Sequence, residues 1–265
     1  MSAKTGFDHI AGSYDKTFTE TATGRGQRAI VQDYLENKIN AGASVLELNC
    51  GTGEDAVWLA KHGAQVLATD VSAEMVAITS GKTRQAGLSH LIRTEILDIR
   101  ALTKERLNAK FDLVLSNFGG LNCLSPDEMR AFGTVLPHLL KPGGLFVAVV
   151  MSRFCWWETL YFLLKGRRRA AFRRLSVEAV EARLDERASI PVWYFSPLEF
   201  RRFFPDLHVR TVQPVGFWLP PSYLDPLVAD KPRLLEILNF SEQKCRGRLW
   251  AWGADHFMLA GSFLK

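Results

Sequence analysis

Five short apolar runs, separated by amphipathic stretches, constrain the fold of this chain more than any other feature. In order between residues 44 and 151 they are "SVLELN", "QVLATD", "LIRTEILD", "FDLVLSN" and "GLFVAVVM". Runs that are rich in Val, Leu and Ile and almost continuously apolar are typical of buried parallel strands. The stretches between them predict helices at Glu54–His62, Ala73–Ala86, Thr103–Leu107 and Asp127–Leu140. Strands that alternate with helices predict a Rossmann-like, doubly wound α/β sheet.

Residues with strong end preferences support these helix boundaries. Ser72 stands where it can cap the second helix, and Ser125-Pro126 opens the last one with proline at the first helical position. "KPGG", Lys141 to Gly144, is expected to end that helix and turn the chain into the next strand.

The chain divides into four segments by sequence character. Residues 1–43 predict an N-terminal helical segment that closes over a ligand site and includes an amphipathic helix at Gly24–Asn40. Residues 44–151 form the α/β core. Residues 152–206 are aromatic and basic, and predict a helical insertion or cap that holds an acceptor site. Residues 207–265 predict two late strands, "HVRTVQPVGFWLP" and "ADHFMLAGSFL", at the sheet edge, with a helix near Lys231–Trp250 between them.

Composition and cysteine usage exclude several classes of protein. Of the 265 residues 47% are hydrophobic and 23% are charged, as is usual for a globular chain. No apolar run approaches the roughly 18 residues that cross a bilayer, and the first residues lack the apolar core of a signal peptide. Cys50, Cys123, Cys155 and Cys245 form no C-x-x-C pair, so neither a metal site nor a disulfide framework is predicted. We therefore expect a cytoplasmic protein with free thiols.

A glycine-rich turn follows the first apolar run and raises the question of the cofactor. Gly51 to Ala56 fits the G-x-G-x-x-(G/A) dinucleotide fingerprint, which makes a nicotinamide or flavin oxidoreductase one interpretation. A pyrophosphate there would lie at the start of the following helix, where Glu54 and Asp55 would repel it. A ligand without phosphate and with positive charge would meet no such repulsion. S-adenosyl-L-methionine, which carries a sulfonium and an ammonium, fits better.

Acidic residues at the strand ends agree with this cofactor. Asp70 ends the second run, where a carboxylate can accept both ribose hydroxyls, as it also could in a nicotinamide enzyme. Asp98 ends the third run and can accept from an adenine amino group, with the Ile99 N–H as a donor. Glu47, within the first run, can orient the glycine turn or face the ammonium. The acid before the glycines separates the two interpretations.

Five of these motifs together resemble a known family. "VLELNCGTG", "ATDVS", "ILDIR", "FDLVLSNFGGL" and "LKPGG" are similar in order and spacing to the motifs of class I S-adenosylmethionine-dependent methyltransferases. "FDHIAGSYD" resembles the segment before the core in the ubiquinone/biotin-pathway type of small-molecule methyltransferase. The resemblance covers about residues 7–150 and implies a seven-stranded sheet with a terminal antiparallel hairpin. Asn49 departs from the glycine, alanine or proline common there, and can alter the hydrogen bonding of the turn.

The resemblance and the strand ends together give a set of expected cofactor-binding residues. Tyr14 would fold over the methionyl part, and Arg28 could pair with its carboxylate. The full predicted set is Tyr14, Arg28, Glu47, Asn49, Gly51, Gly53, Asp70, Val71, Met75, Asp98, Ile99, Ser116, Asn117 and Phe118.

The acceptor side is less defined by the sequence. "SNFG", residues 116–119, lacks the N/D-P-P-Y/F tetrapeptide of amino-methylating DNA enzymes, which argues against that route. We expect the substrate to contact Asn122 and Cys123 and, from the insertion, Trp156, Trp157 and Tyr161. His256, at the start of the last strand, is the candidate general base.

The basic segment Lys165–Arg174, "KGRRRAAFRR", has three interpretations besides a solvated helix end. The insertion can be a cap on an apolar acceptor pocket, a membrane-surface helix or a nucleic-acid patch. We predict a methyltransferase of a small organic acceptor, through O, N or C, that produces S-adenosylhomocysteine. The alternatives are an RNA (tRNA) methyltransferase that uses the basic insertion, and a non-catalytic S-adenosylmethionine-binding protein. The oligomeric state is left open.

Overall fold

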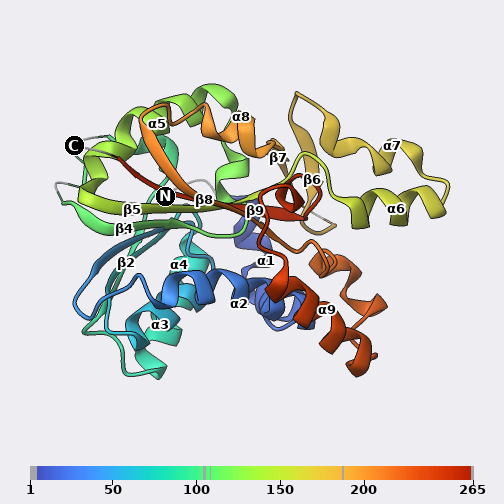
Figure 1. The fold of residues 1–265 in the computed structure, drawn as a ribbon. Helices are drawn as coiled ribbons and strands as arrows, with labels where there is room; N and C mark the ends of the chain where they lie inside the picture. The colour runs from blue at the N-terminus through green and yellow to red at the C-terminus, as the bar shows by residue number, and fades with distance from the viewer. Residues whose placement is uncertain (1–4, 104–105, 108, 187, 264–265) are drawn as a thin grey trace.

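A seven-stranded sheet forms the centre of the computed structural model, which describes residues 5–103, 106–107, 109–186 and 188–263 (Figure 1). The strand order is β3-β2-β1-β4-β5-β9-β8. The first five of these strands pair in parallel, and β9 runs antiparallel to both β5 and β8. This confirms the predicted sheet with a terminal antiparallel pair. The strands are β1 Ser44–Leu48, β2 Gln65–Asp70, β3 Ile92–Ile96, β4 Phe111–Ser116, β5 Leu140–Met151, β8 Leu207–Val215 and β9 His256–Phe263.

Helices cover both faces of this sheet (Figure 1). On one face lie α2 (Ala22–Glu36), α3 (Glu54–Lys61) and α4 (Ala73–Gln85), and on the other α5 (Pro126–Leu139) and α8 (Pro197–Arg201). Two buried clusters result, because successive side chains of a strand point to opposite faces. Along β1, Leu46 and Leu48 belong to the cluster with α5 and α8, whereas Val45 belongs to the cluster with α2 and α3. The continuously apolar runs of the sequence thus reflect burial on both faces.

The helix starts follow the capping residues in the sequence. The Ser72 hydroxyl accepts from the Met75 N–H at 3.1 Å, and Ser125 forms a reciprocal capping box with Glu128 ahead of α5. Helix α2 begins at Ala22, earlier than the predicted Gly24, because Thr21 caps it by accepting from the Gly24 N–H. The predicted helix Thr103–Leu107 falls partly on residues 104–105, outside the described residues; residues 106–107 form a turn.

The N-terminal segment is helical, as predicted. Helix α1 (Gly6–Tyr14) continues directly into a π-helix, Asp15–Thr19, before α2 begins. A π-helical turn of this kind is frequent near functional sites. The side chains of Thr52 and Lys82 hold it against the core, since Thr52 Oγ1 donates to Asp15 at 2.6 Å and Lys82 Nζ lies 2.7 Å from the same carboxylate.

The insertion differs from the helical cap that the sequence predicts. It contains α6 (Trp156–Leu164) and α7 (Arg168–Ala171), but then an antiparallel hairpin of β6 (Val180–Arg183) and β7 (Ser189–Val192). Each strand has only four residues, which is too short for an alternating pattern to predict the hairpin. Pro191 within β7 also argues against a strand, because proline cannot donate a ladder hydrogen bond. After β8 come the 3₁₀ turn Ser222–Leu227, α9 (Pro232–Lys244) and the 3₁₀ turn Trp250–Trp252. Among the described residues, no helix has the length and apolar character to cross a membrane.

Candidate active site

The carboxyl ends of the parallel strands bring the predicted polar residues to one edge of the sheet. Glu47 of β1 lies opposite Ala68 of β2 and Leu115 of β4, so the loops after all three strands open together. The strand order reverses at β1, because β2 lies on one side of it and β4 on the other. Open α/β sheets bind ligands at this switch point.

The glycine turn after β1 is built by three residues with positive φ: Asn49 (50°), Gly51 (54°) and Gly53 (81°). A Cβ atom on Gly53 would lie 2.5 Å from Thr79 Cγ2, so only glycine fits there. At Gly51, by contrast, a Cβ would have only Tyr14 Cε1 near it, at 3.8 Å. The turn is therefore tightly packed on the side of Thr79 and leaves space on the side of Tyr14.

Asn49 connects the loops that follow β1 and β4. Its amide nitrogen donates to the Asn117 carbonyl at 2.8 Å, and its amide oxygen accepts from the Ser116 hydroxyl at 2.6 Å. Gly120 permits this contact, because a Cβ there would lie 2.1 Å from Asn49 Cγ. The departure from the family pattern at this position is thus a side chain that links two strand ends.

Asp70 organises the same edge. One carboxylate oxygen accepts from the Gly51 N–H at 2.9 Å and the other from the Ser72 N–H at 2.9 Å. Burial raises the pKa of Asp70, and the backbone donors oppose that rise. The side chain of Asp98 is held by Arg100, whose Nε lies 2.9 Å from it. Burial would raise the pKa of Asp98, but the Arg100 hydrogen bonds hold it below its ordinary value.

A cavity of about 500 Å³ opens above these strand ends. Of the residues predicted for the site, eleven line it, and six others from the core, α2 and β9 do not. Those that line it are Tyr14, Asn49, Gly51, Asp70, Val71, Met75, Asp98, Ile99, Asn117, Phe118 and Cys123. Those outside its lining are Arg28, Glu47, Gly53, Ser116, Asn122 and His256.

The other walls of the cavity come from α1 and the β6–β7 hairpin, and of their residues only Tyr14 was predicted to belong to the site. Helix α1 contributes Phe7, Ile10 and Tyr14, which are spaced to share one helix face. This spacing is the sequence pattern from which the α1 wall could have been predicted. The hairpin and the segment next to it contribute Ala182, Leu184, Ile190, Pro191 and Val192.

The two walls meet at the start of α1. A Cβ on Gly6 would lie 2.8 Å from Ile190 Cγ2, so helix and hairpin are in close contact. Asp8 fixes α1 to the core, because the Ser72 hydroxyl donates to its carboxylate at 2.5 Å. Burial would raise the pKa of Asp8, but hydrogen bonds from Ser72 and Thr5 hold it below its ordinary value.

Glu47 is buried beneath the glycine turn, with 2% of its surface exposed. Among the described residues its Oε2 atom has no hydrogen-bond partner. Burial raises the pKa of Glu47 well above its ordinary value, and the nearby Asp55 carboxylate raises it further. An uncompensated buried carboxyl oxygen is the kind of group that a cationic ligand would satisfy.

The acids of the first turn of α3 have cationic partners, which corrects the charge argument from the sequence. Arg28 forms an ion pair with Asp55, and Asn117 Nδ2 donates to the same carboxylate at 2.9 Å. Lys82 Nζ lies 3.5 Å from Glu54. Arg28 is thereby engaged within the protein, with its guanidinium 5.0 Å from the centre of the Phe118 ring. The turn is less negative than the sequence alone implies.

Trp156, Trp157 and Tyr161, predicted to contact substrate, do not line the cavity. The indole N–H groups of Trp156 and Trp157 donate to the carbonyls of Phe217 and Trp218, at 2.5 and 3.0 Å. On the buried side of α6, Glu158 binds Arg173, Arg174 and Tyr223. The helix therefore packs against the loop after β8, and the hairpin takes the place beside the cavity.

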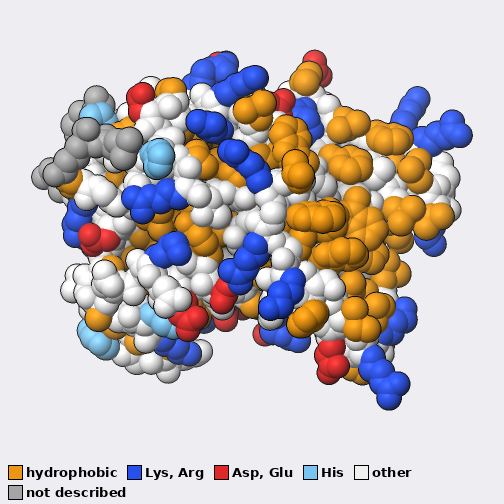
Figure 2. Space-filling view, viewed as in Figure 1, with side chains coloured by type: hydrophobic (Ala, Val, Ile, Leu, Met, Phe, Trp, Pro, Cys, Tyr) orange, Lys and Arg blue, Asp and Glu red, His pale blue; other side chains and the backbone are white. Residues whose placement is uncertain are grey.

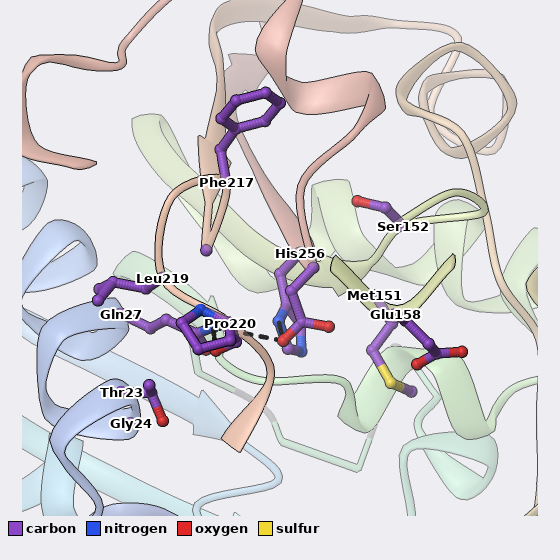
Figure 3. A network of polar contacts seen from close by, with 12 residues as sticks. Thr23, Gly24, Gln27, Met151, Ser152, Glu158, Phe217, Leu219, Pro220 and His256 are labelled. Carbon is purple, nitrogen blue, oxygen red and sulfur yellow. Dashed lines mark hydrogen bonds and ion pairs between the residues drawn. The ribbon is translucent and has the colours of Figure 1, made fainter. Parts of the chain in front are cut away.

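His256 lies behind Phe118, with their ring centres 5.5 Å apart. Figure 3 shows its side chain between Pro220 and Met151. Its Nδ1 atom lies 3.2 Å from Asp255, whose carboxylate also accepts from Arg174 at 2.8 Å. Burial would raise the pKa of Asp255, but its interactions with His256 and Arg174 hold it below its ordinary value. His256 thus belongs to a buried polar network next to the cavity.

Asn122 and the basic segment also have structural partners. Asn122 Oδ1 accepts from the Met151 N–H at 2.8 Å, and its Nδ2 donates to the Trp193 carbonyl at 2.6 Å. Arg174 is buried and Arg173 is partly buried, both on Glu158. Only the first part of Lys165–Arg174 therefore presents its charges to solvent.

Comparison with known proteins agrees with this architecture. Residues 45–144 match a family model described as "Methyltransferase domain". A demethylmenaquinone methyltransferase of Clavibacter sepedonicus is 33% identical over 146 residues, 55% of this chain and 56% of that protein. A ribosomal RNA small subunit methyltransferase C of Alcanivorax borkumensis is 29% identical over 140 residues, 52% of this chain and 41% of that protein. The chain thus spans about half the length of these curated relatives.

Similarity of fold extends over nearly the whole chain. The solved DhpI–SAH complex superposes with a TM-score of 0.62 at 18% identity. The match covers 97% of this chain and 93% of the chain in that complex. The fold and the strand ends form a Rossmann-like α/β core with a cavity at its switch point. Together with the family match, they identify residues 45–144 as a class I S-adenosylmethionine-dependent methyltransferase domain.

Proposed function

We propose that this chain transfers the methyl group of S-adenosylmethionine to a small organic acceptor with a substantial apolar part. One observation carries the proposal: a single cavity has a polar end at the strand termini and an apolar end between α1 and the hairpin. The charged residues that line it, Asp70, Asp98 and Arg100, all belong to the polar end. The similarity to a demethylmenaquinone methyltransferase supports a small acceptor.

At the polar end, we assign the cofactor to the residues around the glycine turn. Asp70 would accept the ribose hydroxyls, and Asp98, with the Ile99 N–H, would bind the adenine amino group. Glu47 lies beneath the glycine turn and outside the cavity lining, so it would act on the ammonium through the turn; its Oε2 atom has no partner among the described residues. The cofactor supplies a methyl group already activated by its sulfonium. The protein therefore has to align the acceptor and exclude water.

At the apolar end, α1 and the hairpin would enclose the acceptor. Phe7, Ile10, Leu184 and Ile190 provide surface that favours an apolar body over a charged one. Water exclusion follows from the same contacts, because the start of α1 closes against Ile190.

The lining residues supply no evident base. Burial raises the pKa of Tyr14 and of Cys123 to about 12 in each case, so neither would deprotonate an acceptor near neutral pH. His256 stays a candidate only if Phe118 moves from in front of it. We therefore favour an acceptor atom that is nucleophilic without enzymatic deprotonation.

The experiment measures S-adenosylhomocysteine formation by chromatography, with a panel of small quinols, phenols and amines beside tRNA and ribosomal RNA. Two variants test the polar end and the apolar end of the cavity separately. Asp70→Ala should lose cofactor affinity, whereas Ala182→Phe, which adds bulk to the hairpin wall, should retain cofactor affinity and lose turnover. Folding of both variants is checked by circular dichroism.

The outcomes distinguish the alternatives. Turnover with an apolar small molecule supports the proposal. Turnover with RNA alone would favour the RNA methyltransferase, whose support is the similarity to a ribosomal RNA methyltransferase. Tight S-adenosylhomocysteine binding without product from either class would favour a non-catalytic binding protein. A thermal shift with NADH or NADPH and none with S-adenosylhomocysteine would refute the cofactor assignment.

A further inference from the structure

One side of the molecule carries large apolar side chains that the described residues of the chain leave uncovered. Figure 2 shows them gathered over the region where Figure 1 places α6, α7 and α9. We define this apolar face by six strongly exposed residues: Leu164 (79%), Ile237 (62%), Phe240 (64%), Leu249 (84%), Trp250 (47%) and Trp252 (46%). Contiguous exposed surface of this kind marks an interaction site.

Aromatic packing joins the elements of the apolar face into one support. The Trp156 ring lies 4.5 Å from that of Trp157 and 6.0 Å from Phe217, which in turn lies 4.8 Å from Trp250. Trp157 also packs with the small buried cluster that includes Leu238 of α9. Helices α6 and α9 and the turn 250–252 therefore present their outer residues from one rigid base.

The charge around the apolar face is strongly biased. Residues 156–175 hold six Lys and Arg and one acid, and residues 222–252 hold five Lys and Arg and four acids. Three of those five acids, Glu158, Asp225 and Glu242, are buried, which leaves Asp230 and Glu236 exposed. Figure 2 shows Lys and Arg at the outer margin of this face.

The acids at the surface do not neutralise the cations next to α6. Within the part of the chain that the structure describes, no ion pair joins Lys165 or Arg167–Arg169 to a carboxylate. Lys165 and Arg167 instead lie over the rings of Tyr161 and Phe162, at 5.9 and 5.5 Å. These charges are available to an anionic partner.

An apolar centre with tryptophans and a cationic margin is complementary to the surface of an anionic bilayer. Tryptophan is favoured at the level of the head groups, leucine and phenylalanine enter the acyl boundary, and Lys and Arg bind anionic head groups. A second copy of this chain fits less well. An isologous dimer through this face would bring its two cationic margins together.

We propose that the apolar face docks onto the surface of a bilayer that contains anionic phospholipid. This is independent of the methyl acceptor, because it rests on the surface of α6, α7, α9 and residues 249–252. It assigns a role to the exposed part of the basic segment that the cofactor site does not use.

The test is flotation of the full chain with phosphatidylcholine vesicles, with and without phosphatidylglycerol. The chain should float with the anionic vesicles and lose that binding at high salt. The triple variant Arg167→Glu/Arg168→Glu/Arg169→Glu should bind the anionic vesicles at least roughly 100-fold more weakly, since each cation near such a surface contributes roughly fivefold and each new carboxylate adds repulsion. The double variant Leu164→Ser/Leu249→Ser should also lose binding, because it removes the residues that enter the lipid.

Matched variants on α8 control for general effects of charge and polarity. Leu198 is 48% exposed, and Leu198→Ser and Arg201→Glu/Arg202→Glu should leave binding unchanged. Thermal unfolding of every variant verifies the fold. No flotation with either vesicle, or equal loss in the α8 controls, would overturn the proposal. So would a dimer in sedimentation that Leu164→Ser/Leu249→Ser dissociates, or tRNA binding through Arg167–Arg169 without vesicle binding.

Discussion

Replacement of Glu47 by glutamine should have opposite effects on folding and on cofactor binding. Glu47 is 2% exposed, and its Oε2 atom has no hydrogen-bond partner among the described residues. The charge of the nearby Asp55 carboxylate contributes to its raised pKa. Glutamine has nearly the same shape and carries no charge. Glu47→Gln therefore removes ionisation from the site while the packing under the glycine turn stays nearly unchanged.

The sign of the stability effect follows from the raised pKa. A carboxyl that holds its proton more tightly in the folded protein contributes fully to stability below its ordinary pKa of 4.5. That contribution is lost as the pH rises from this value to the raised pKa. Within this interval the free energy of unfolding falls by about 1.4 kcal/mol per pH unit. Glu47→Gln has no proton to release, so its advantage over the wild type should grow with pH at that rate and then become constant.

The assay is urea unfolding of both proteins without ligand at a series of pH values from 5 to 8, together with titration of S-adenosylhomocysteine. The stability difference in favour of the variant should grow with pH, because the wild type loses stability. The variant should lose roughly tenfold or more in affinity, since a charge-assisted hydrogen bond contributes about 1.5–3 kcal/mol. Glu54→Gln is the matched control: its side chain is 45% exposed, so its pH profile should follow the wild type. Parallel stability curves for Glu47→Gln and wild type would refute the reasoning about the buried carboxyl.

Three further substitutions test other parts of the structure. Asp70→Asn should weaken S-adenosylhomocysteine binding by roughly 10- to 100-fold in calorimetry, because the carboxylate acts on both the turn and the proposed ribose; unchanged affinity would contradict the site. Gly120→Ala should lower the free energy of unfolding in urea by about 1–3 kcal/mol, since its Cβ would displace Asn49. Gly81→Ala, in open space on α4, should raise it by up to about 1 kcal/mol. Equal effects of the two substitutions would contradict the packing argument. Glu158→Gln should lose about 3–5 kcal/mol in the same assay by leaving buried arginine charge uncompensated, and a neutral result would show that water reaches that site.

The sequence alone determined the sheet and most of the edge that lines the cavity. The apolar runs predicted strands buried on both faces, and the residues just after them were brought together because parallel strands end at a common edge. Asp70, Asp98 and Asn117 were predicted in this way and Tyr14 from the family resemblance, and all four line the cavity. These inferences depend on short segments whose geometry is fixed by strand direction and by glycine.

Only the tertiary structure decided what closes the cavity and which charges are free. Arg28 and Asp55 are 27 residues apart, and Arg174 and Asp255 are 81 apart, so their pairing leaves no local pattern. The hairpin likewise lines the cavity, whereas α6 packs against residues 217–218. Strand periodicity is a local property that the sequence displays directly. Neutralisation of a buried charge and the placement of a cap depend on distant partners, which only folding brings into contact.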